Sequence, residues 1–319
     1  MDRKEAVLAV SVVLAAGIIG FMLLRVWDDL LLAVRHWNPL YLVAAIAFST
    51  AGWWLRGARY RSILGRLGVL AGLIFSTACV LISQTANLII PARLGDLVRI
   101  FILKHEDLSG YQTGISSIVI ERFFDILTVA LLGLIALPFV PGIPPWVYPV
   151  IVIPLALCGV FAFFLLALGK VQSRNRILAI GLSMIREMRR ASLTIGSVAG
   201  LSALSLVIWA TDILTTVSMA LMFQAEISLA VVILAVVVGN LFKAVPVTPG
   251  GIGTYEAAMA VILVLSGTAQ ATATLIAVSD HLVKNVITAA GGVLSIRLLG
   301  TWVVDAIRDA FRGRKEIGA

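Results

Sequence analysis

The chain has 319 residues, of which 60% are hydrophobic and 13% are charged, and its formal net charge is +8. A soluble domain carries about a quarter charged residues, so this composition excludes a water-soluble fold and places most of the chain in lipid. The basic residues form short clusters between apolar runs, a distribution that fits membrane orientation and contact with anionic lipid better than binding to nucleic acid.

Apolar windows follow one another along the chain, and most reach the roughly 20 residues that a helix needs to cross the hydrocarbon. We expect helices, because a spanning segment must satisfy its own backbone hydrogen bonds. The first window lacks a small-x-small cleavage site and is predicted to be a retained span. The windows lie near residues 6–24, 38–55, 68–90, 112–137, 146–168, 195–223, 228–247, 257–267 and 270–299.

Charges between the windows predict the orientation. Arginine and lysine gather at 56–66, in a loop at about 169–193 and in a tail at about 300–319, all of which the positive-inside rule places in the cytoplasm. The uncharged loop at 138–148 and the turn at 224–226 suit the outer side. We therefore predict a multi-pass protein of the cell membrane with both termini in the cytoplasm.

This orientation requires two segments to enter and leave on the same side of the membrane. Residues 68–111 must start and end inside, and residues 228–268 must start and end outside. The predicted fold is a single all-α polytopic transmembrane domain, 1–319, with about six full spans and two re-entrant hairpins. The alternative, in which some hairpin limbs cross fully, stays open.

The two hairpin tips are similar in sequence. The first reads NLIIPARLGDLVR from Asn87, and the second reads NLFKAVPVTPGGIGTYEAA from Asn240. An intramembrane acid follows each tip at nearly the same distance, because 25 residues separate Asp96 from Glu121 and 24 separate Glu256 from Asp280. Three spans lie between the hairpins, so the two halves would form an inverted repeat, as in many secondary transporters.

Several charged residues are predicted to lie at membrane depth, where each costs on the order of 2.5–3.5 kcal/mol unless it has a partner. Arg122 and Asp125 can pair on one helix face, as can Asp280 and Lys284. Glu121 points elsewhere, either into a wet cavity or toward a basic group such as Arg93 or Lys284. The alternative for all of them is a set of ion pairs that only holds helices together.

A polar stripe at three-four spacing marks the window 195–223. It faces protein or water, and its alternative role is hydrogen bonding between packed helices. The stripe consists of Ser202, Ser205, Trp209, Asp212 and Thr216.

The second tip, Pro249 to Gly253, cannot form a regular helix, so its backbone must be buried in protein or line a polar cavity. A helix starting near Thr254 would turn its positive end toward that cavity and attract a phosphate. Arg93 and Arg99 are predicted to give bidentate contacts to the same phosphate. The alternative is a break that only lets the hairpin turn.

Together these arguments select a set of candidate substrate-binding residues. We predict no catalytic residue, metal site or cofactor, because Cys79 and Cys158 stand alone and lack ligand spacing with any histidine. The candidates are Asn87, Arg93, Asp96, Arg99, Glu121, Arg122, Asp125, Asn240, Gly250, Gly251, Gly253, Thr254, Tyr255, Glu256, Asp280 and Lys284.

Three motifs resemble one known family. PARLGD at 91–96, ERFFD at 121–125 and PGGIGTYEAA at 249–258 are similar to the flippase-like transmembrane region of lysylphosphatidylglycerol synthase, the multiple peptide resistance factor. The resemblance spans nearly the whole chain and implies a polytopic helical fold that moves a modified phospholipid to the outer leaflet. The chain ends at Ala319 without the aminoacyl-transfer domain of full-length synthases, so we expect a stand-alone translocator whose substrate need not be lysylphosphatidylglycerol.

The sequence therefore predicts a non-enzymatic flippase for an anionic or modified polar lipid or a lipid-linked sugar. Asp96, Glu121 and Glu256 would bind the cationic part of a headgroup or carry coupling protons. Expected partners are membrane lipids with an anionic or polyprenyl-linked headgroup and a lipid-synthesising enzyme acting in trans, but not nucleic acid. Two alternatives are a non-catalytic membrane partner of a lipid-modifying enzyme or glycosyltransferase, and an intramembrane lipid transferase.

Overall fold

The computed structural model describes residues 13, 16–24, 27, 37–169, 171, 173–245, 247–300 and 302–304. The predicted first span is described only at 13 and 16–24, which are helical, and most of the predicted cytoplasmic tail lies outside the described residues. Within the described part the chain is helical and contains no strand.

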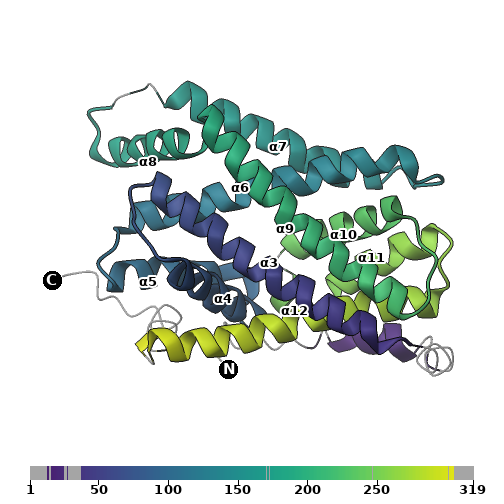
Figure 1. Ribbon diagram of the computed structural model, residues 1–319. Coiled ribbons are helices and arrows are strands. Elements are labelled where there is room, and N and C mark those ends of the chain that lie inside the picture. The colour runs from purple at the N-terminus through teal and green to yellow at the C-terminus, as the bar shows by residue number, and fades with distance from the viewer. Residues whose placement is uncertain are drawn as a thin grey trace.

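The helices form one bundle around two interrupted hairpins (Figure 1). Long helices correspond to most of the apolar windows, which confirms the all-helical prediction. In chain order the elements are α3 (Pro39–Arg66), α4 (Leu73–Ile89), η1 (Pro91–Leu97), α5 (Val98–His105), α6 (Tyr111–Ala136), η2 (Leu137–Phe139), α7 (Val147–Leu168), α8 (Arg176–Ser192), α9 (Ile195–Met222), α10 (Leu229–Ala244), η3 (Pro249–Gly251), α11 (Thr254–Leu265) and α12 (Gln270–Leu299).

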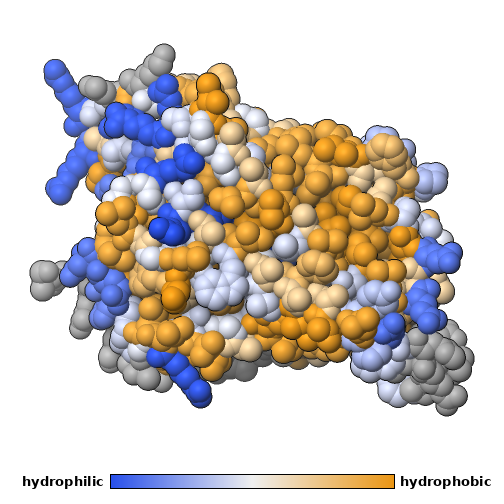
Figure 2. Space-filling view, viewed as in Figure 1, coloured by the Kyte–Doolittle hydropathy of each residue, from blue (hydrophilic) through white to orange (hydrophobic). Residues whose placement is uncertain are grey.

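The surface of the bundle is that of a membrane protein. Among the described residues, α7, α9 and α12 are long and apolar enough to cross a bilayer. Figure 2 shows a broad hydrophobic zone with hydrophilic residues gathered at the two ends, chiefly the end that holds α8. A hydrophobic belt between two hydrophilic ends is the pattern expected of a protein whose middle is surrounded by the hydrocarbon of a membrane.

The two kinds of loop lie at opposite ends of the bundle. At the α8 end, the Arg66 guanidinium at the end of α3 binds the Gly196 carbonyl and the Ser197 hydroxyl at the start of α9. At the other end, segments 139–141, 223–228 and 265–269 surround a common pocket. The basic and the uncharged connections are thus separated along the bundle, and the side of the membrane that each end faces stays a prediction.

Two predicted boundaries are corrected. The helix in window 38–55 continues to Arg66, because Arg56 and Arg59 turn inward to carboxylates and do not end it in water. The predicted loop at 169–193 contains the helix α8, whose last turn carries Arg189 and Arg190.

Each hairpin consists of two short helices joined by a break. In the first, α4 ends before Pro91, and Gly95 lets η1 fold back on α4, because a Cβ there would lie 2.5 Å from the Asn87 nitrogen. In the second, Gly250 and Gly251 have φ of 63° and 74°, conformations that favour glycine. In Figure 1, α4 and α5 lie toward the α8 end and α10 and α11 toward the other.

The two breaks meet inside the bundle. η3 contacts both η1 and α4. A Cβ added to Gly250 would lie 3.4 Å from the Leu88 Cα atom, so the two backbones are close together here. The contact brings together residues that are about 160 positions apart in the sequence.

Candidate functional site

A polar cavity of about 170 Å³ lies where the two hairpin tips meet. Its walls come from α3, α4, α6, α9, α10, α11 and α12 and from both breaks, so all of these elements contribute to one space. Nine charged side chains and one histidine are part of the lining. They are Arg56, Arg59, Arg93, Glu121, Arg122, Asp125, Asp212, Lys243 and Lys284, together with His281.

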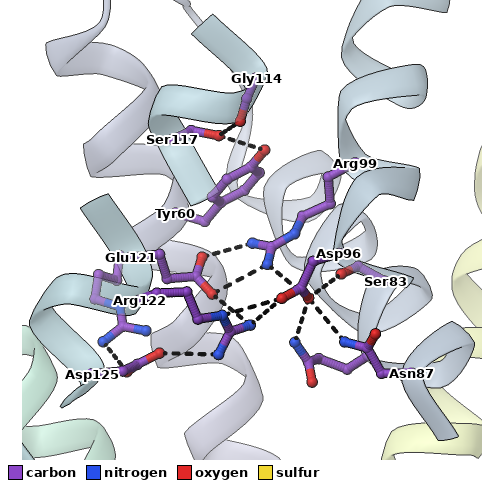
Figure 3. A network of polar contacts seen from close by, with 12 residues as sticks. Tyr60, Ser83, Asn87, Asp96, Arg99, Gly114, Ser117, Glu121, Arg122 and Asp125 are labelled. Atoms are coloured by element: carbon purple, nitrogen blue, oxygen red, sulfur yellow. Dashed lines mark hydrogen bonds and ion pairs between the residues drawn. The ribbon is translucent and has the colours of Figure 1, made fainter. Parts of the chain in front are cut away.

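Asp96 fixes the first hairpin tip (Figure 3). Its Oδ1 accepts hydrogen bonds from the side chains of Ser83, Gln84 and Asn87 at 2.9–3.1 Å. Its Oδ2 pairs with the Arg122 guanidinium at 2.9 Å. The carboxylate is 6% exposed, and its role in the structure is to hold η1 against α4 and α6.

Glu121 lines the cavity, which was one of the two expected alternatives, and its close partner is Arg99 instead of Arg93 or Lys284, the basic groups named for the other alternative. The Arg99 guanidinium lies 2.6 Å and 3.3 Å from the two Glu121 oxygens and 3.3 Å from Asp96 (Figure 3). Arg99 is fully buried and does not line the cavity, so the predicted contact between Arg99 and a phosphate is wrong for this conformation. The i,i+3 spacing on α5 and η1 places Arg99 beside Asp96 instead.

The predicted pair Arg122–Asp125 forms at 3.5 Å, but Asp125 also has a closer partner on another helix. Arg59 of α3 donates to Asp125 at 2.7 Å and to Ser205 of α9 at 2.8 Å. Ser205 belongs to the predicted polar stripe, which therefore binds neighbouring helices at this position.

The second hairpin tip is held by Glu256. One of its oxygens accepts a hydrogen bond from the N–H of Gly253, the N-cap residue of α11, at 2.7 Å. The other oxygen lies 2.8 Å from His281 Nδ1. Thr254, the first residue of α11, does not line the cavity, contrary to our expectation, whereas the next residue, Tyr255, does. His281 Nε2 lies 3.0 Å from the Lys243 Nζ.

Asp280 is fully buried behind this tip. It accepts hydrogen bonds from Tyr255 and Thr216 at 2.7 Å, and it forms the predicted pair with Lys284 at 2.9 Å. Thr216 and Asp212 are further members of the polar stripe, and Asp212 pairs with Arg56 at 3.0 Å. The stripe thus joins α9 to α3 and α12.

The charge balance of the cavity is positive. Six basic side chains line it against three carboxylates, Glu121, Asp125 and Asp212, and each of these carboxylates is already ion-paired with an arginine. Within the described part of the chain, Arg93 forms no ion pair and no side-chain hydrogen bond, and Lys243 contacts no carboxylate. Among the described residues the cavity therefore has two cations that contact no carboxylate, one from each hairpin tip.

The predicted site residues fall into two groups. Ten line the cavity: Asn87, Arg93, Glu121, Arg122, Asp125, Asn240, Gly250, Gly251, Tyr255 and Lys284. The other six, Asp96, Arg99, Gly253, Thr254, Glu256 and Asp280, lie outside the lining and, apart from Thr254, brace it through the contacts described above.

Sequence reasoning missed four charged lining residues as site members: Arg56, Arg59, Asp212 and Lys243. The two arginines read as loop charges because they follow an apolar window. Lys243 carried a usable signal, since it lies within the second tip motif in NLFKA. His281 was also missed, and its nearness to the charged pair Asp280 and Lys284 was the available clue.

Comparison with known proteins agrees with the tip motifs. The family model described as the lysylphosphatidylglycerol synthase TM region matches residues 8–292. The chain is 31% identical to glycosyltransferase AglD of Haloferax volcanii over 86% of its own length and 51% of that protein. It is 27% identical to a UPF0104 membrane protein of Methanocaldococcus jannaschii over 56% of its own length and 79% of that protein. The chain thus spans about half the length of AglD, and no solved structure gives a significant match.

Proposed function

This chain belongs to the family of the lysylphosphatidylglycerol synthase transmembrane region, and we propose that it moves a lipid with an anionic headgroup between the two leaflets of the membrane. The observation that carries the proposal is the pair of cations without anionic partners. Arg93 and Lys243 come from opposite hairpins and line one cavity at the place where the hairpins meet. A charge at membrane depth is costly without a partner, and a bound phosphate would supply one for both.

The pairing of the carboxylates favours the phosphate as the recognised part of the headgroup. Glu121, Asp125 and Asp212 are each bound by an arginine of the protein, so the described lining offers no unpaired carboxylate to a cationic headgroup. We therefore propose a phospholipid or a lipid-linked sugar phosphate as substrate, and we assign Asp96, Glu121 and Glu256 to shaping the site.

We further propose that the hairpins are re-entrant and that the chain is an inverted repeat of about six spans with cytoplasmic termini. Two features support this. The hairpins extend toward opposite ends of the bundle, and each tip is joined to the acid that follows it about 25 residues later. Arg99 links Asp96 to Glu121 in the first half, and Tyr255, next to Glu256, binds Asp280 in the second. Rocking of one half against the other would open the cavity to each leaflet in turn.

The proposal is tested in liposomes that carry the purified protein and fluorescent phosphatidylglycerol. Dithionite bleaches only outer-leaflet lipid, so in liposomes with wild-type protein the lipid that starts in the inner leaflet should also be bleached, as the protein moves it outward. Arg93→Gln and Lys243→Gln should each slow this transfer at least tenfold. Arg61→Gln removes the same charge from an exposed site on α3 outside the cavity and should leave the rate unchanged.

Folding of each variant is confirmed by its elution as a monodisperse peak and by its melting temperature. Wild-type protein that transfers neither phosphatidylglycerol nor a polyprenyl-phosphate sugar would contradict the proposal. Equal transfer rates in wild type, Arg93→Gln and Lys243→Gln would show that the assigned site is wrong, even if the protein transfers lipid.

One observation favours a second candidate function. AglD is named a glycosyltransferase, and the chain matches about half of its length. A membrane region that holds or feeds a glycosyltransferase is therefore the alternative. It predicts that the protein stays bound to such an enzyme through detergent purification. It also predicts that, in membranes lacking this chain, the Arg93→Gln variant restores glycolipid synthesis as well as the Arg61→Gln variant does.

A further inference from the structure

Two basic side chains are in direct hydrogen-bond contact in the second hairpin. Lys243 Nζ of α10 lies 3.0 Å from His281 Nε2 of α12. A lysine and a histidine that are both protonated have no acceptor to share and repel one another at this distance. The contact therefore requires that one of the two groups is neutral.

The other ring nitrogen shows how the proton is arranged. Glu256 Oε1 lies 2.8 Å from His281 Nδ1, and Glu256 Oε2 accepts the Gly253 N–H, so the carboxylate acts as an acceptor through both oxygens. This assigns the N–H of a neutral imidazole to Nδ1 and leaves Nε2 as an acceptor for the Lys243 ammonium. Glu256, His281 and Lys243 then form a neutral chain with an open place for one more proton at Nε2.

We propose that this pair binds a proton together with the anionic headgroup, so that translocation is coupled to proton movement. The inference rests on the proposed function of the same cavity. Lys243 lines the cavity and is only half-buried, whereas His281 is 1% exposed. An anion beside Lys243 draws its flexible ammonium toward the cavity, which frees Nε2 and offsets the repulsion between two cations.

The proton balance of this step is simple. In the empty site one dissociable proton is shared by the pair and lies on Lys243 Nζ or on His281 Nε2. The two hydrogens of the neutral amine and the hydrogen on Nδ1 are not counted, because they stay in place throughout. Binding of the anion adds one proton from water, so that Nζ is an ammonium bound to the anion and His281 is an imidazolium bound to Glu256. Release of the anion on the other side returns that proton to water.

The surrounding charges permit this change. The groups that act on His281 are Lys243 of α10, Glu256 of α11 and its neighbour Asp280 on α12, and its ring packs 4.5 Å from that of Tyr255. A second set acts on Lys243: Arg93 of η1 and Lys284 of α12 repel it, and Glu256 and Asp212 of α9 attract it. Because carboxylates from three helices, α9, α11 and α12, act on the pair, an added proton meets negative as well as positive charge.

The test measures protons taken up on binding. Wild-type protein in phosphatidylcholine nanodiscs is titrated with dihexanoyl phosphatidylglycerol in two buffers that differ in ionisation enthalpy. The phosphodiester of this probe does not titrate near neutral pH, so a difference in heat reports protons bound by the protein. We expect uptake of about one proton per lipid, and a Kd that rises about tenfold per pH unit where the empty pair holds one proton.

Two histidine variants locate the proton. His281→Gln should still bind the lipid but with uptake near zero and a Kd that no longer depends on pH. His105→Gln, at a histidine that stacks on Trp302 away from the cavity, should behave as wild type. If His281→Gln does not fold, the pH dependence of the wild-type Kd alone decides whether binding is coupled to proton uptake.

The outcomes separate this inference from the proposed function. Binding with equal heats in both buffers and a flat pH profile would overturn the proton coupling and leave the translocator intact. Undiminished proton uptake in folded His281→Gln would also overturn it. Absence of binding by wild type of both this probe and a polyprenyl-phosphate sugar, with dihexanoyl phosphatidylcholine as reference, would overturn both.

Discussion

Replacing Arg99 with methionine should strongly destabilise the protein without touching the cavity surface. Arg99 is 0% exposed and neutralises Glu121 at 2.6 Å. In its absence Asp96 keeps Arg122 at 2.9 Å and its amide and hydroxyl donors, whereas Glu121 keeps only Arg122 at 3.6 Å. The main cost is therefore one buried carboxylate that has lost its close partner.

Breaking a buried ion pair on one side costs about 3–5 kcal/mol, because the remaining charge stays desolvated. We expect this cost for Arg99→Met, which lowers the folding equilibrium constant roughly 150- to 5,000-fold. The loss should fall below about 2 kcal/mol in Arg99→Met/Glu121→Gln, where the uncompensated charge is absent. Arg93→Gln should cost less than about 1 kcal/mol, since Arg93 forms no ion pair among the described residues.

Reversible unfolding in mixed detergent micelles with increasing dodecyl sulfate measures these differences through tryptophan fluorescence. If the free energy of unfolding of Arg99→Met is within about 1 kcal/mol of wild type, the Arg99–Glu121 ion pair contributes less to stability than its burial suggests. A double variant no more stable than Arg99→Met would place the cost in lost packing of the arginine side chain.

Three further predictions follow from the packing and charge of the same region. Gly251→Ala should cost about 1–3 kcal/mol in the same unfolding assay and weaken phosphatidylglycerol binding, because φ is 74° and the new Cβ would lie 2.5 Å from the Lys243 Cγ. Gly57→Ala should cost about 1–3 kcal/mol but leave the affinity of the remaining folded protein unchanged, since its Cβ would lie 2.8 Å from the α4 backbone outside the cavity. Asp212→Asn should tighten phosphatidylglycerol binding roughly threefold to tenfold, about 0.7–1.4 kcal/mol, by releasing Arg56; unchanged or weaker binding in titrations of the nanodisc protein would argue against an anion in this cavity.

The helices could be predicted from the sequence because their signal is local. The windows 112–137 and 195–223 correspond to α6 and α9 within one residue at each end. The pairs Arg122–Asp125 and Asp280–Lys284 were predictable for the same reason, since both partners lie on one helix face at fixed spacing.

Contacts between helices could not be predicted in this way. Arg99 and Glu121 are 22 positions apart and Lys243 and His281 are 38 apart, so only the packing of whole helices decides these partners. Hydropathy also ended the second window at residue 55, because it scores an arginine as polar whether it faces water or a buried carboxylate. The inward turn of Arg56 and Arg59 depends on α6 and α9, which the local sequence does not contain.

The close approach of Gly250 to Leu88 has a consequence for the evolution of this chain. At this contact a Cβ at position 250 would lie 3.1 Å from a Leu88 methyl carbon and 3.4 Å from the Leu88 Cα atom. Neither tip can therefore gain volume independently of the other. Because Gly250 also has φ of 63°, position 250 should stay glycine among homologous chains, and position 88, although 162 residues away, should stay no larger than leucine.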